Sequence, residues 1–374
     1  MLTRVEIKNY RGFESYEMQG LSQVNLLVGK NNSGKTALLE GIQFLTSGGD
    51  PSVLAEVAER RGEIVLGRSE PPGYPGRAVI IDIAHFFHGH TLGTDTTFSF
   101  KGDNGYTPVS VKTFAQKISR GDSDEGRSDR TEPAGFFLRI AGGVASGDRE
   151  FERKFRISRE GGVDFEIPSR LRRPGTVRRG HGPQVRFVGP DLLNSTDIAI
   201  MWDEITLTGQ EVDVAGAMRL LEENLESVHL LTGMFASGIF PSRGGIVVGM
   251  KGQEGRVPLG SMGDGMRRLM SLATSLAFTK DGCLFVDEID TGLHYSVMSD
   301  MWKMVILKAI ASNTQVFATT HSWDCIEGLS QLCQSEPDLM SKVAIHKIDR
   351  TISHSIPFSG ESIVRMVKAD IDPR

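Results

Sequence analysis

Apolar runs and amphipathic segments alternate near both ends of the chain. Residues 24–28, 283–287 and 316–320 form short, nearly continuous apolar runs, which is the pattern of strands buried in a sheet. Apolar residues recur at helical spacing in 36–42 and 269–273. Strands that alternate with helices predict an α/β fold with a mixed, largely parallel sheet flanked by helices.

The middle of the chain has a different pattern. Apolar and polar residues alternate in 78–83 and 151–157, as they do in strands with one exposed face. The polar tract 117–130 predicts a mobile tip. We therefore expect a β-rich lobe inserted between two α/β segments.

A capping box marks the return to helical periodicity. Residues 208–211 read Thr-Gly-Gln-Glu, which places a hydroxyl three positions before a carboxylate, as at the start of many helices. Val212, Ala215, Met218 and Leu221 follow at helical spacing. The sequence predicts a helix that begins at this box and carries these four side chains on its apolar face.

Residues 29–36, GKNNSGKT, fit the P-loop pattern GxxxxGK[ST] between a predicted strand and a predicted helix. Gly29 and Gly34 allow backbone angles that let consecutive amides converge on phosphate oxygens. Lys35 would reach the β- and γ-phosphates, and the Thr36 hydroxyl would bind Mg²⁺. The alternative is a chance glycine-rich turn, which the flanking strand and helix disfavour.

Two later strand ends carry side chains that complement a P-loop. Asp287 and Glu288 follow an apolar run, where Asp287 would hold Mg²⁺ and Glu288 would activate the attacking water. A solvated strand end is the simpler alternative for this pair. His321 closes the next predicted strand, where it could sense the γ-phosphate, and Ser322 could cap the helix that follows.

The order of these motifs resembles the ABC-type ATPases of the structural-maintenance-of-chromosomes and RecF class. It is similar in particular to the ATPase module of the OLD (overcoming lysogenization defect) family and its stand-alone relatives. Local phrases that match are IKNYRGF at 7–13, GKNN at 29–32, MWDEI at 201–205 and GLH at 292–294. The resemblance implies an ATPase that uses ATP and Mg²⁺.

By this resemblance, residues 261–268 would be the ABC signature, which caps the nucleotide of a second subunit. An ATP-sandwich homodimer is therefore implied. The usual serine-glycine-glycine order is absent, so either Ser261 or Gly263 would take the place of the serine. A glycine-rich connection before a helix is the structural alternative.

Further roles are implied by the resemblance alone. Arg11 would face the nucleotide, or belong to sheet surface and core; Asp290 would lie at the dimer contact, and Gln184 is a candidate for the glutamine that links nucleotide to lobe. The implied catalytic residues are Glu288, Lys35 and His321, and the metal ligands are Thr36 and Asp287. The implied nucleotide-binding residues are Gly29, Asn31, Asn32, Ser33, Gly34, Lys35, Thr36, Ala37, Arg11, Ser261, Gly263 and Gly265.

Three ranges follow from these motifs. Residues 1–48 would form the N-terminal part of the ATPase core, 49–185 the β-rich lobe with mobile loops, and 186–374 a helical segment and the rest of the core. Full-length OLD nucleases continue into a Toprim domain, for which the stretch after His321 is too short. We therefore expect any nuclease activity to belong to a separate chain.

Composition is that of a soluble enzyme, since 374 residues with 39% hydrophobic content can bury a large core. Three cysteines without metal-ligand spacing, no membrane-spanning run and no signal-peptide pattern predict a cytoplasmic protein. The net charge of -5 disfavours indiscriminate DNA coating. One basic, proline-broken segment stands out and could bind nucleic acid or an acidic partner, or be a solvated loop: Arg170, Arg172, Arg173, Arg178, Arg179, His181 and Arg186.

The sequence thus predicts an ATP-hydrolysing dimeric switch. By resemblance its setting would be a bacterial anti-phage or toxin–antitoxin type system with a separate effector chain. A RecF-like, DNA-binding repair ATPase is the main alternative. A module that binds ATP with little hydrolysis is a further one, and an ABC transporter subunit is disfavoured by the imperfect signature.

Overall fold

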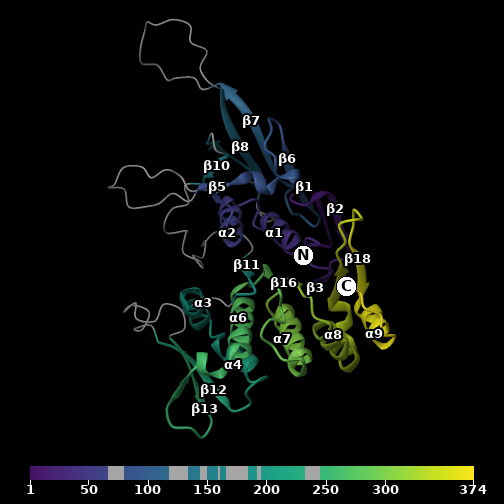
Figure 1. The fold of residues 1–374 in the computed structure, drawn as a ribbon. Helices are drawn as coiled ribbons and strands as arrows, with labels where there is room; N and C mark the ends of the chain where they lie inside the picture. Colours follow the sequence, from purple (N-terminus) through teal and green to yellow (C-terminus); the bar gives the residue numbers. More distant parts are fainter. Residues whose placement is uncertain are drawn as a thin grey trace, which may run out of the picture. The chain divides into compact units, whose positions relative to one another are not determined.

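The computed structural model divides into two compact units, which we describe separately (Figure 1). The residues it describes are 1–65, 80–117, 134–143, 150–158, 161–165, 184–191, 195–231 and 245–374. The first unit comprises Met1–Arg4, Glu17–Leu39 and Arg173–Arg374. The second comprises Val5–Tyr16 and Glu40–Arg172.

A six-stranded sheet in the order β11-β15-β16-β3-β17-β18 forms the centre of the first unit. Every pair is parallel except β17 with β18. All residues of β3, β15 and β16 are buried, which explains their continuous apolar runs. The predicted mixed, largely parallel sheet is confirmed for this unit. Its strands are β3 (Val24–Val28), β11 (Val185–Val188), β15 (Cys283–Val286), β16 (Gln315–Thr319), β17 (Val343–Lys347) and β18 (Ile356–Ser359).

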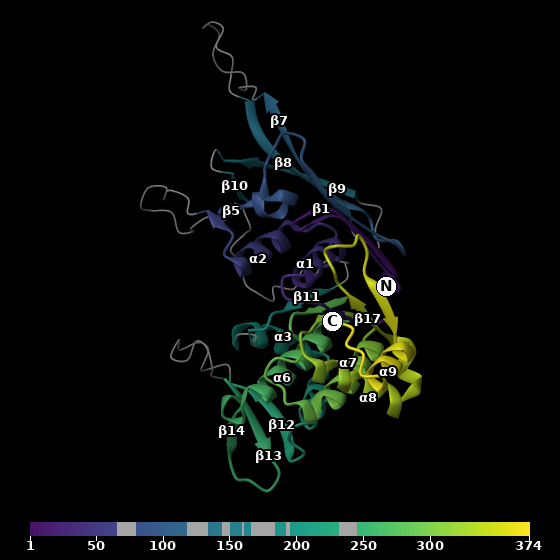
Figure 2. The ribbon, with the colours of Figure 1, turned by 45° about the vertical axis from the view of Figure 1, so that its right-hand side comes forward.

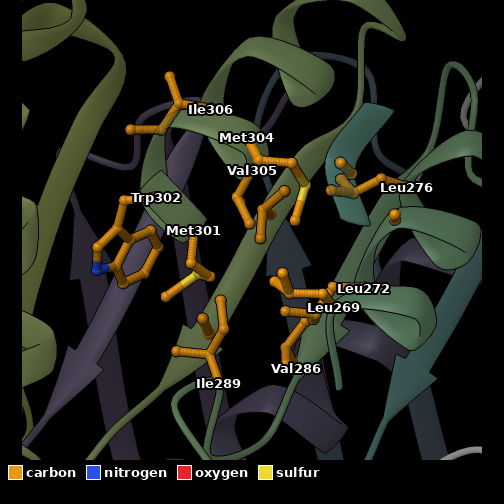
Figure 3. Close-up of a cluster of buried hydrophobic side chains, with 14 of the residues drawn as sticks. Leu269, Leu272, Leu276, Val286, Ile289, Met301, Trp302, Met304, Val305 and Ile306 are labelled. Carbon is orange, nitrogen blue, oxygen red and sulfur yellow. The ribbon is translucent and has the colours of Figure 1, made fainter. Parts of the chain in front are cut away.

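Helices pack against this sheet and bury one continuous hydrophobic core. The close-up in Figure 3 shows Leu269, Leu272 and Leu276 next to Val286 and the methionine- and valine-rich face of the following helix. The Trp302 indole donates a hydrogen bond to the Cys325 carbonyl at 2.8 Å. The helices are α3 (Ser195–Leu207), α4 (Glu211–Met218), α6 (Asp264–Phe278), α7 (Met298–Ala311), α8 (Trp323–Ser335) and α9 (Gly360–Lys368).

The predicted capping box at 208–211 is wrong. The Thr208 hydroxyl donates to the carbonyls of Glu204 and Ile205, so it ends α3 instead of starting α4. Gln210 precedes α4 without a side-chain cap, and Val212 is 67% exposed. A helix in this region is confirmed, but the competing C-terminal turn of α3 uses the hydroxyl. A small antiparallel sheet follows: β12 (Leu225–Leu230), β13 (Ile246–Met250) and β14 (Arg256–Pro258).

A nine-stranded sheet in the order β2-β1-β6-β7-β8-β9-β10-β5-β4 dominates the second unit. The strand pairs β1–β6, β6–β7, β7–β8, β8–β9, β9–β10, β10–β5 and β5–β4 are all antiparallel. Most pairs in the sheet of the first unit are parallel instead. The strands are β1 (Arg4–Tyr10), β2 (Phe13–Gln19), β4 (Ile64–Val65), β5 (Ile80–Asp82), β6 (Thr97–Gly102), β7 (Val109–Lys117), β8 (Ala134–Gly143), β9 (Glu150–Ile157) and β10 (Gly162–Asp164). Two helices accompany it: α1 (Lys35–Thr46), which begins in the first unit, and α2 (Pro51–Arg61).

Close packing joins α1 to this sheet. A Cβ on Gly41 would lie 2.6 Å from the Phe100 ring, so only glycine lets the helix approach β6. The second unit also contains residues that the sequence grouped with the P-loop segment. Val5–Tyr16 belong here because β1 pairs with β6, with Val5 opposite Gly102. The tract 117–130 lies outside the described residues except for Lys117, which ends β7.

Candidate active site

Four parallel strands end at one edge of the six-stranded sheet, where ligands of α/β folds bind. The P-loop follows β3, Asp287 follows β15, Thr320 follows β16 and Gly189 follows β11. Because these strands are parallel and in register, residues that are far apart in the sequence meet at this edge. Figure 2 shows the first unit from a second side.

The P-loop is a tight turn that requires glycine at its start. Gly29 has φ 146°, and a Cβ there would lie 2.5 Å from the Ile348 carbonyl oxygen. Gly34 has φ 96° at the other end of the loop. The Ser33 amide donates to the Lys30 carbonyl at 3.2 Å. These constraints deliver the chain to the first residue of α1, Lys35.

Lys35 folds back over this loop. Its Nζ donates to the carbonyls of Gly29 at 2.8 Å and Lys30 at 3.0 Å. It also lies 3.5 Å from His321 Nδ1. Burial lowers the pKa of Lys35 to about 8, although Asp287 and Glu288 oppose the shift. The ammonium is thus held by weak neutral acceptors, which phosphate oxygens would replace with charge-assisted bonds.

Hydroxyl groups from one helix, α1, and one strand, β16, contact the Asp287 carboxylate. Thr36 Oγ1 lies 3.1 and 3.0 Å from its two oxygens, and Thr319 Oγ1 donates to Oδ1 at 2.6 Å. The Thr319 oxygen in turn accepts from the Glu288 amide at 2.8 Å. Thr319 therefore fixes both Asp287 and Glu288.

Glu288 adopts a backbone conformation that is unfavourable for its type. Its φ is 50°, in the left-handed region that costs a non-glycine residue about 1 kcal/mol or more. Its carboxylate is half-buried, and the Thr291 hydroxyl lies 3.4 Å from Oε2. Such strain persists only where surrounding contacts enforce it, and it gathers at functional sites.

The enforcing contacts come from Arg268, a fully buried side chain on α6. Its guanidinium donates to the carbonyls of Gly189 at 2.7 Å, Asp287 at 2.9 Å and Glu288 at 2.7 Å. A longer bond of 3.4 Å reaches the Ile289 carbonyl. Burial lowers the pKa of Arg268 to about 10, against the raising effect of the nearby acids. Arg268 therefore clamps the backbone that carries Asp287 and Glu288.

From the sequence, Arg268 was placed only within the expected signature, 261–268, and Thr319 was assigned no role. The available signal was an arginine among Met266, Leu269 and Leu272 on the apolar face of a predicted helix, where a charge needs buried partners. Thr319 begins the sequence Thr-Thr-His-Ser at 319–322, in which only His321 and Ser322 were given roles. Arg268 and Thr319 contact the backbone of Asp287 and Glu288 and the Asp287 carboxylate. A sequence motif does not show such contacts between distant segments.

The remaining residues of the β16 end have local partners. His321 is exposed, and its carbonyl accepts a hydrogen bond from Arg374. The Asp290 carboxylate accepts from Thr320 Oγ1 at 2.6 Å within the same chain. Ser322 caps α8 by accepting from the Cys325 amide, as predicted.

The residues of the expected signature lie at the start of α6. Ser261 belongs to a 3₁₀ turn, Leu259–Met262, and is exposed. Gly263, with φ 91°, directly precedes α6, and no atom lies within 4 Å of a Cβ placed on it. Gly265 is in the first turn, and a Cβ there would lie 3.2 Å from the Gly292 carbonyl oxygen.

Arg11 is already engaged in the second unit. Its guanidinium binds Glu63 through two bonds of 2.7 and 2.9 Å, and Nε lies 3.2 Å from a Glu40 oxygen. It also lies 4.7 Å from the centre of the Phe86 ring. The sequence predicted two alternative environments for Arg11, one facing the nucleotide and one in sheet surface and core. The contacts in the structure correspond to the second. Arg11 is only 6% exposed.

Gln184 is wrong as the nucleotide-linking glutamine. It precedes β11 and its carbonyl accepts from the Cys283 amide at 2.8 Å, at the start of β15. The P-loop and Asp287 lie at the opposite ends of these strands. Of the basic segment, only Arg186, in β11, falls within the described residues.

The residues present fit a nucleoside triphosphate with a divalent cation. The Ser33 hydroxyl is buried within the P-loop and has no hydrogen-bond partner among the described residues, which leaves a donor for a phosphate oxygen. Thr36 and Asp287 offer the hydroxyl and carboxylate that hold Mg²⁺ beside phosphates. Asn31, Asn32 and Ala37 belong to the same loop and first helical turn. In the described part of the chain, no helix is long and apolar enough to cross a membrane.

Comparison with known proteins found similar sequences, a similar fold and a matching family. An "ATP/GTP phosphatase" of Helicobacter pylori is 23% identical over 97% of each chain. An uncharacterized protein of Methanocaldococcus jannaschii is 26% identical over 37% of this chain and 58% of its own. A crystal structure of an SMC head bound to the C-winged helix domain of ScpA aligns with a TM-score of 0.48 and 12% identity, covering 96% of this chain and 98% of that one. The AAA ATPase domain family matches residues 1–65 and 195–326, more than half of the chain, and the chain therefore belongs to this family of ATPases.

Proposed function

We propose that this ATPase binds ATP with Mg²⁺ at the P-loop and hydrolyses it with Glu288 as general base. The observation that carries the proposal is the meeting of Thr36 with Asp287 at 3.0 and 3.1 Å. A hydroxyl at the start of the P-loop helix and a carboxylate at the end of the neighbouring strand are the protein ligands of Mg²⁺ in P-loop enzymes.

Phosphate binding would use two donors of the P-loop: the Lys35 ammonium, which now donates to loop carbonyls, and the buried Ser33 hydroxyl. Lys35 Nζ would exchange the Gly29 and Lys30 carbonyls for β- and γ-phosphate oxygens. The buried Ser33 hydroxyl would gain its hydrogen bond. Amides at the N-terminus of α1 add a favourable field for the negative charge.

Hydrolysis requires a water in line with the γ-phosphorus. The Glu288 carboxylate accepts a proton from this water as it attacks, and the bond between the γ-phosphorus and the bridging oxygen breaks. Thr319 and Arg268 hold the Glu288 backbone, so the carboxylate starts from a fixed position. The exposed His321 imidazole, beside Lys35, would contact the γ-phosphate and report its presence.

The start of α6 is the proposed surface for a second copy of the chain. Ser261 and Gly263 are exposed, and Gly263 has open space where a side chain would be. The positive end of α6 suits a phosphate. Arg268 lies on the same helix and clamps Glu288, so closure of an ATP-sandwich homodimer would act on the base through α6.

For the biological setting we propose a dimeric switch that acts with a separate effector chain in a bacterial defence or toxin–antitoxin type system. This rests on the resemblance to the OLD family. The alternative is a RecF-like repair ATPase, which DNA would stimulate. A switch that answers to a protein partner would be indifferent to DNA in the ATPase assay.

The test compares wild type with Glu288→Gln, and with Glu254→Gln as a matched control in an exposed loop. Glu288→Gln should lower ATP turnover by about 10²–10⁴-fold, the usual contribution of a general base, and keep ATP affinity. Light scattering should show the ATP-loaded variant as a dimer and the nucleotide-free protein as a monomer. Normal turnover by Glu288→Gln would refute the assignment of the base.

A further inference from the structure

The central parts of β7 and β8 bury one face of the second unit's sheet, and their side chains on the other face are half-buried or exposed. Along β7 and β8, Val111, Leu138 and Ile140 are buried. The alternate positions point the other way because successive side chains in a strand face opposite sides. Phe114 and Phe137 are half-buried on this outward face. The strands β7, β8 and β9 lie side by side in register (Figure 2).

Three cations occupy directly opposed positions on the outward face. Lys112 pairs with Arg139 across β7 and β8, and Arg139 pairs with Lys154 across β8 and β9. We call Lys112, Arg139 and Lys154 the cation row. Like charges that are directly opposed destabilise a sheet. The cation row therefore lowers the stability of the sheet, which indicates a purpose other than folding.

Acidic side chains offset this charge only in part. Asp95 binds Lys112 at 2.7 Å, and Glu152 binds Arg139 at 3.3 Å. Both cations remain exposed, with 42% of the Lys112 and 44% of the Arg139 side chain accessible. The exposed Lys154 adds a third positive charge.

Aromatic rings form the adjacent row. Phe114 lies opposite Phe137, and their rings stack at 5.7 Å with an angle of 26°. We call this pair the aromatic row; the exposed Arg156 continues it opposite Phe137 on β9. Lys154 Nζ lies 4.0 Å from the centre of the Phe137 ring, and Arg139 lies 5.1 Å from that of Phe114.

The two rows match the two chemical components of an unpaired nucleotide chain. Cations attract phosphates, and flat aromatic rings stack on bases. Two residues along each strand, or about 7 Å, separate the rows, so one chain can use both. An acidic peptide would use the cations but not the flat rings, and a duplex keeps its bases stacked within the helix.

We propose that the outward face of β7, β8 and β9 binds single-stranded nucleic acid, with bases stacked on the aromatic row and phosphates held by the cation row and Arg156. The residues of this surface all belong to the second unit, and its sequence preference should be weak because stacking tolerates every base.

The test measures the fluorescence anisotropy of labelled oligo-dT with the full chain at several salt concentrations. Four probes are compared: oligo-dT, an abasic oligonucleotide of equal length and charge, a DNA duplex and heparin. Oligo-dT should bind more tightly than the abasic chain, because only the bases can stack. It should also bind more tightly than the duplex.

Two sets of variants separate the rows. Phe114→Leu with Phe137→Leu should weaken oligo-dT binding by roughly five- to a hundredfold and leave binding of the abasic chain unchanged. Lys112→Gln, Arg139→Gln and Lys154→Gln together should weaken both and flatten the salt dependence, by about 0.7 in slope for each phosphate that the protein no longer neutralises. The control replaces three exposed lysines of the first unit, Lys251, Lys280 and Lys342, by Gln, and should bind like wild type.

ATPase activity and thermal melting show whether each variant is folded, since no substituted residue belongs to the proposed ATP site. The proposal is overturned if folded wild type fails to bind oligo-dT at low salt. Equal affinity for oligo-dT and the abasic chain would also overturn it, as would a preference for duplex or heparin, or unchanged binding by the phenylalanine variants.

Discussion

Replacing Arg268 by Met tests whether this buried guanidinium positions Glu288. Three carbonyl oxygens, those of Gly189, Asp287 and Glu288, accept its hydrogen bonds at 2.7–2.9 Å. Methionine keeps much of the side-chain volume but donates nothing. The substitution therefore leaves three inward-facing acceptors without this donor and releases the strained backbone of Glu288.

The expected loss of folding stability is the difference between two effects: the penalty for unpaired buried acceptors and the gain from removing a buried charge. A buried acceptor that loses its partner costs about 1–3 kcal/mol, so three lose several kcal/mol together. Burial lowers the pKa of Arg268 from 12.5 to about 10, and removing this unfavourably buried charge returns about 3 kcal/mol. We expect a net loss of about 2–4 kcal/mol, which lowers the Tm by about 5–15 °C in a unit of this size.

The diagnostic assay separates chemistry from binding. Arg268 contacts no part of the P-loop in the described structure, so Arg268→Met should lower kcat by about 100-fold and change the Kd for ATP by less than about threefold. Arg268→Lys keeps the charge without the planar fork and should recover part of kcat. Arg219→Met, which removes an exposed arginine that also donates to backbone carbonyls, those of Leu225 and Glu226, is the control.

A role limited to stability would give a different result. Arg268→Met would then melt at lower temperature but retain a kcat within about threefold of wild type when assayed well below its Tm. An equal loss of ATP affinity and kcat would place the effect in nucleotide binding. Either result would refute the positioning of Glu288 by Arg268.

Three further predictions concern the P-loop. Lys35 has a pKa of about 8 without phosphate, and phosphates favour its charged form, so ATP binding at pH 9 should be accompanied by the uptake of about one proton. Calorimetry in buffers of different ionisation enthalpy measures this uptake. Lys35→Arg, whose side chain stays protonated, should abolish it. Gly29→Ala should cost about 1–3 kcal/mol in denaturant unfolding and weaken ATP binding, because its Cβ meets the Ile348 carbonyl; unchanged values would contradict the loop geometry. Thr36→Val should raise the Mg²⁺ concentration for half-maximal turnover about tenfold, and an unchanged requirement would remove Thr36 from the metal site.

Local patterns predicted the elements that carry the site. The strand before Gly29, the acidic strand end at Asp287 and the cap of α8 at Ser322 are all confirmed because each depends on neighbours in sequence. Membership of the AAA ATPase domain family confirms the predicted ATPase. The predicted capping box at 208–211 was wrong because the preceding helix, α3, is also a sequence neighbour and its Glu204 carbonyl accepts the hydrogen bond of the Thr208 hydroxyl.

Long-range pairing was beyond the sequence. Nothing local indicates that Val5–Tyr16 join a nine-stranded sheet through the pairing of β1 with β6. Nor does it indicate that Gln184 precedes β11, at the opposite end of the strands from the P-loop. The partners of Arg268 lie on three separate segments, so its role depends on the order of strands in the sheet. The left-handed backbone of Glu288 is likewise a result of those contacts.

The most direct test of the proposed ATP site is a crystal structure of Glu288→Gln with ATP and Mg²⁺. We expect Lys35 Nζ to have left the Gly29 and Lys30 carbonyls for the β- and γ-phosphates, with Thr36 and Asp287 on the metal and a water between the substituted side chain at position 288 and the γ-phosphorus. A nucleotide bound elsewhere, or Lys35 still on the loop carbonyls with ATP present, would contradict the proposed ATPase site.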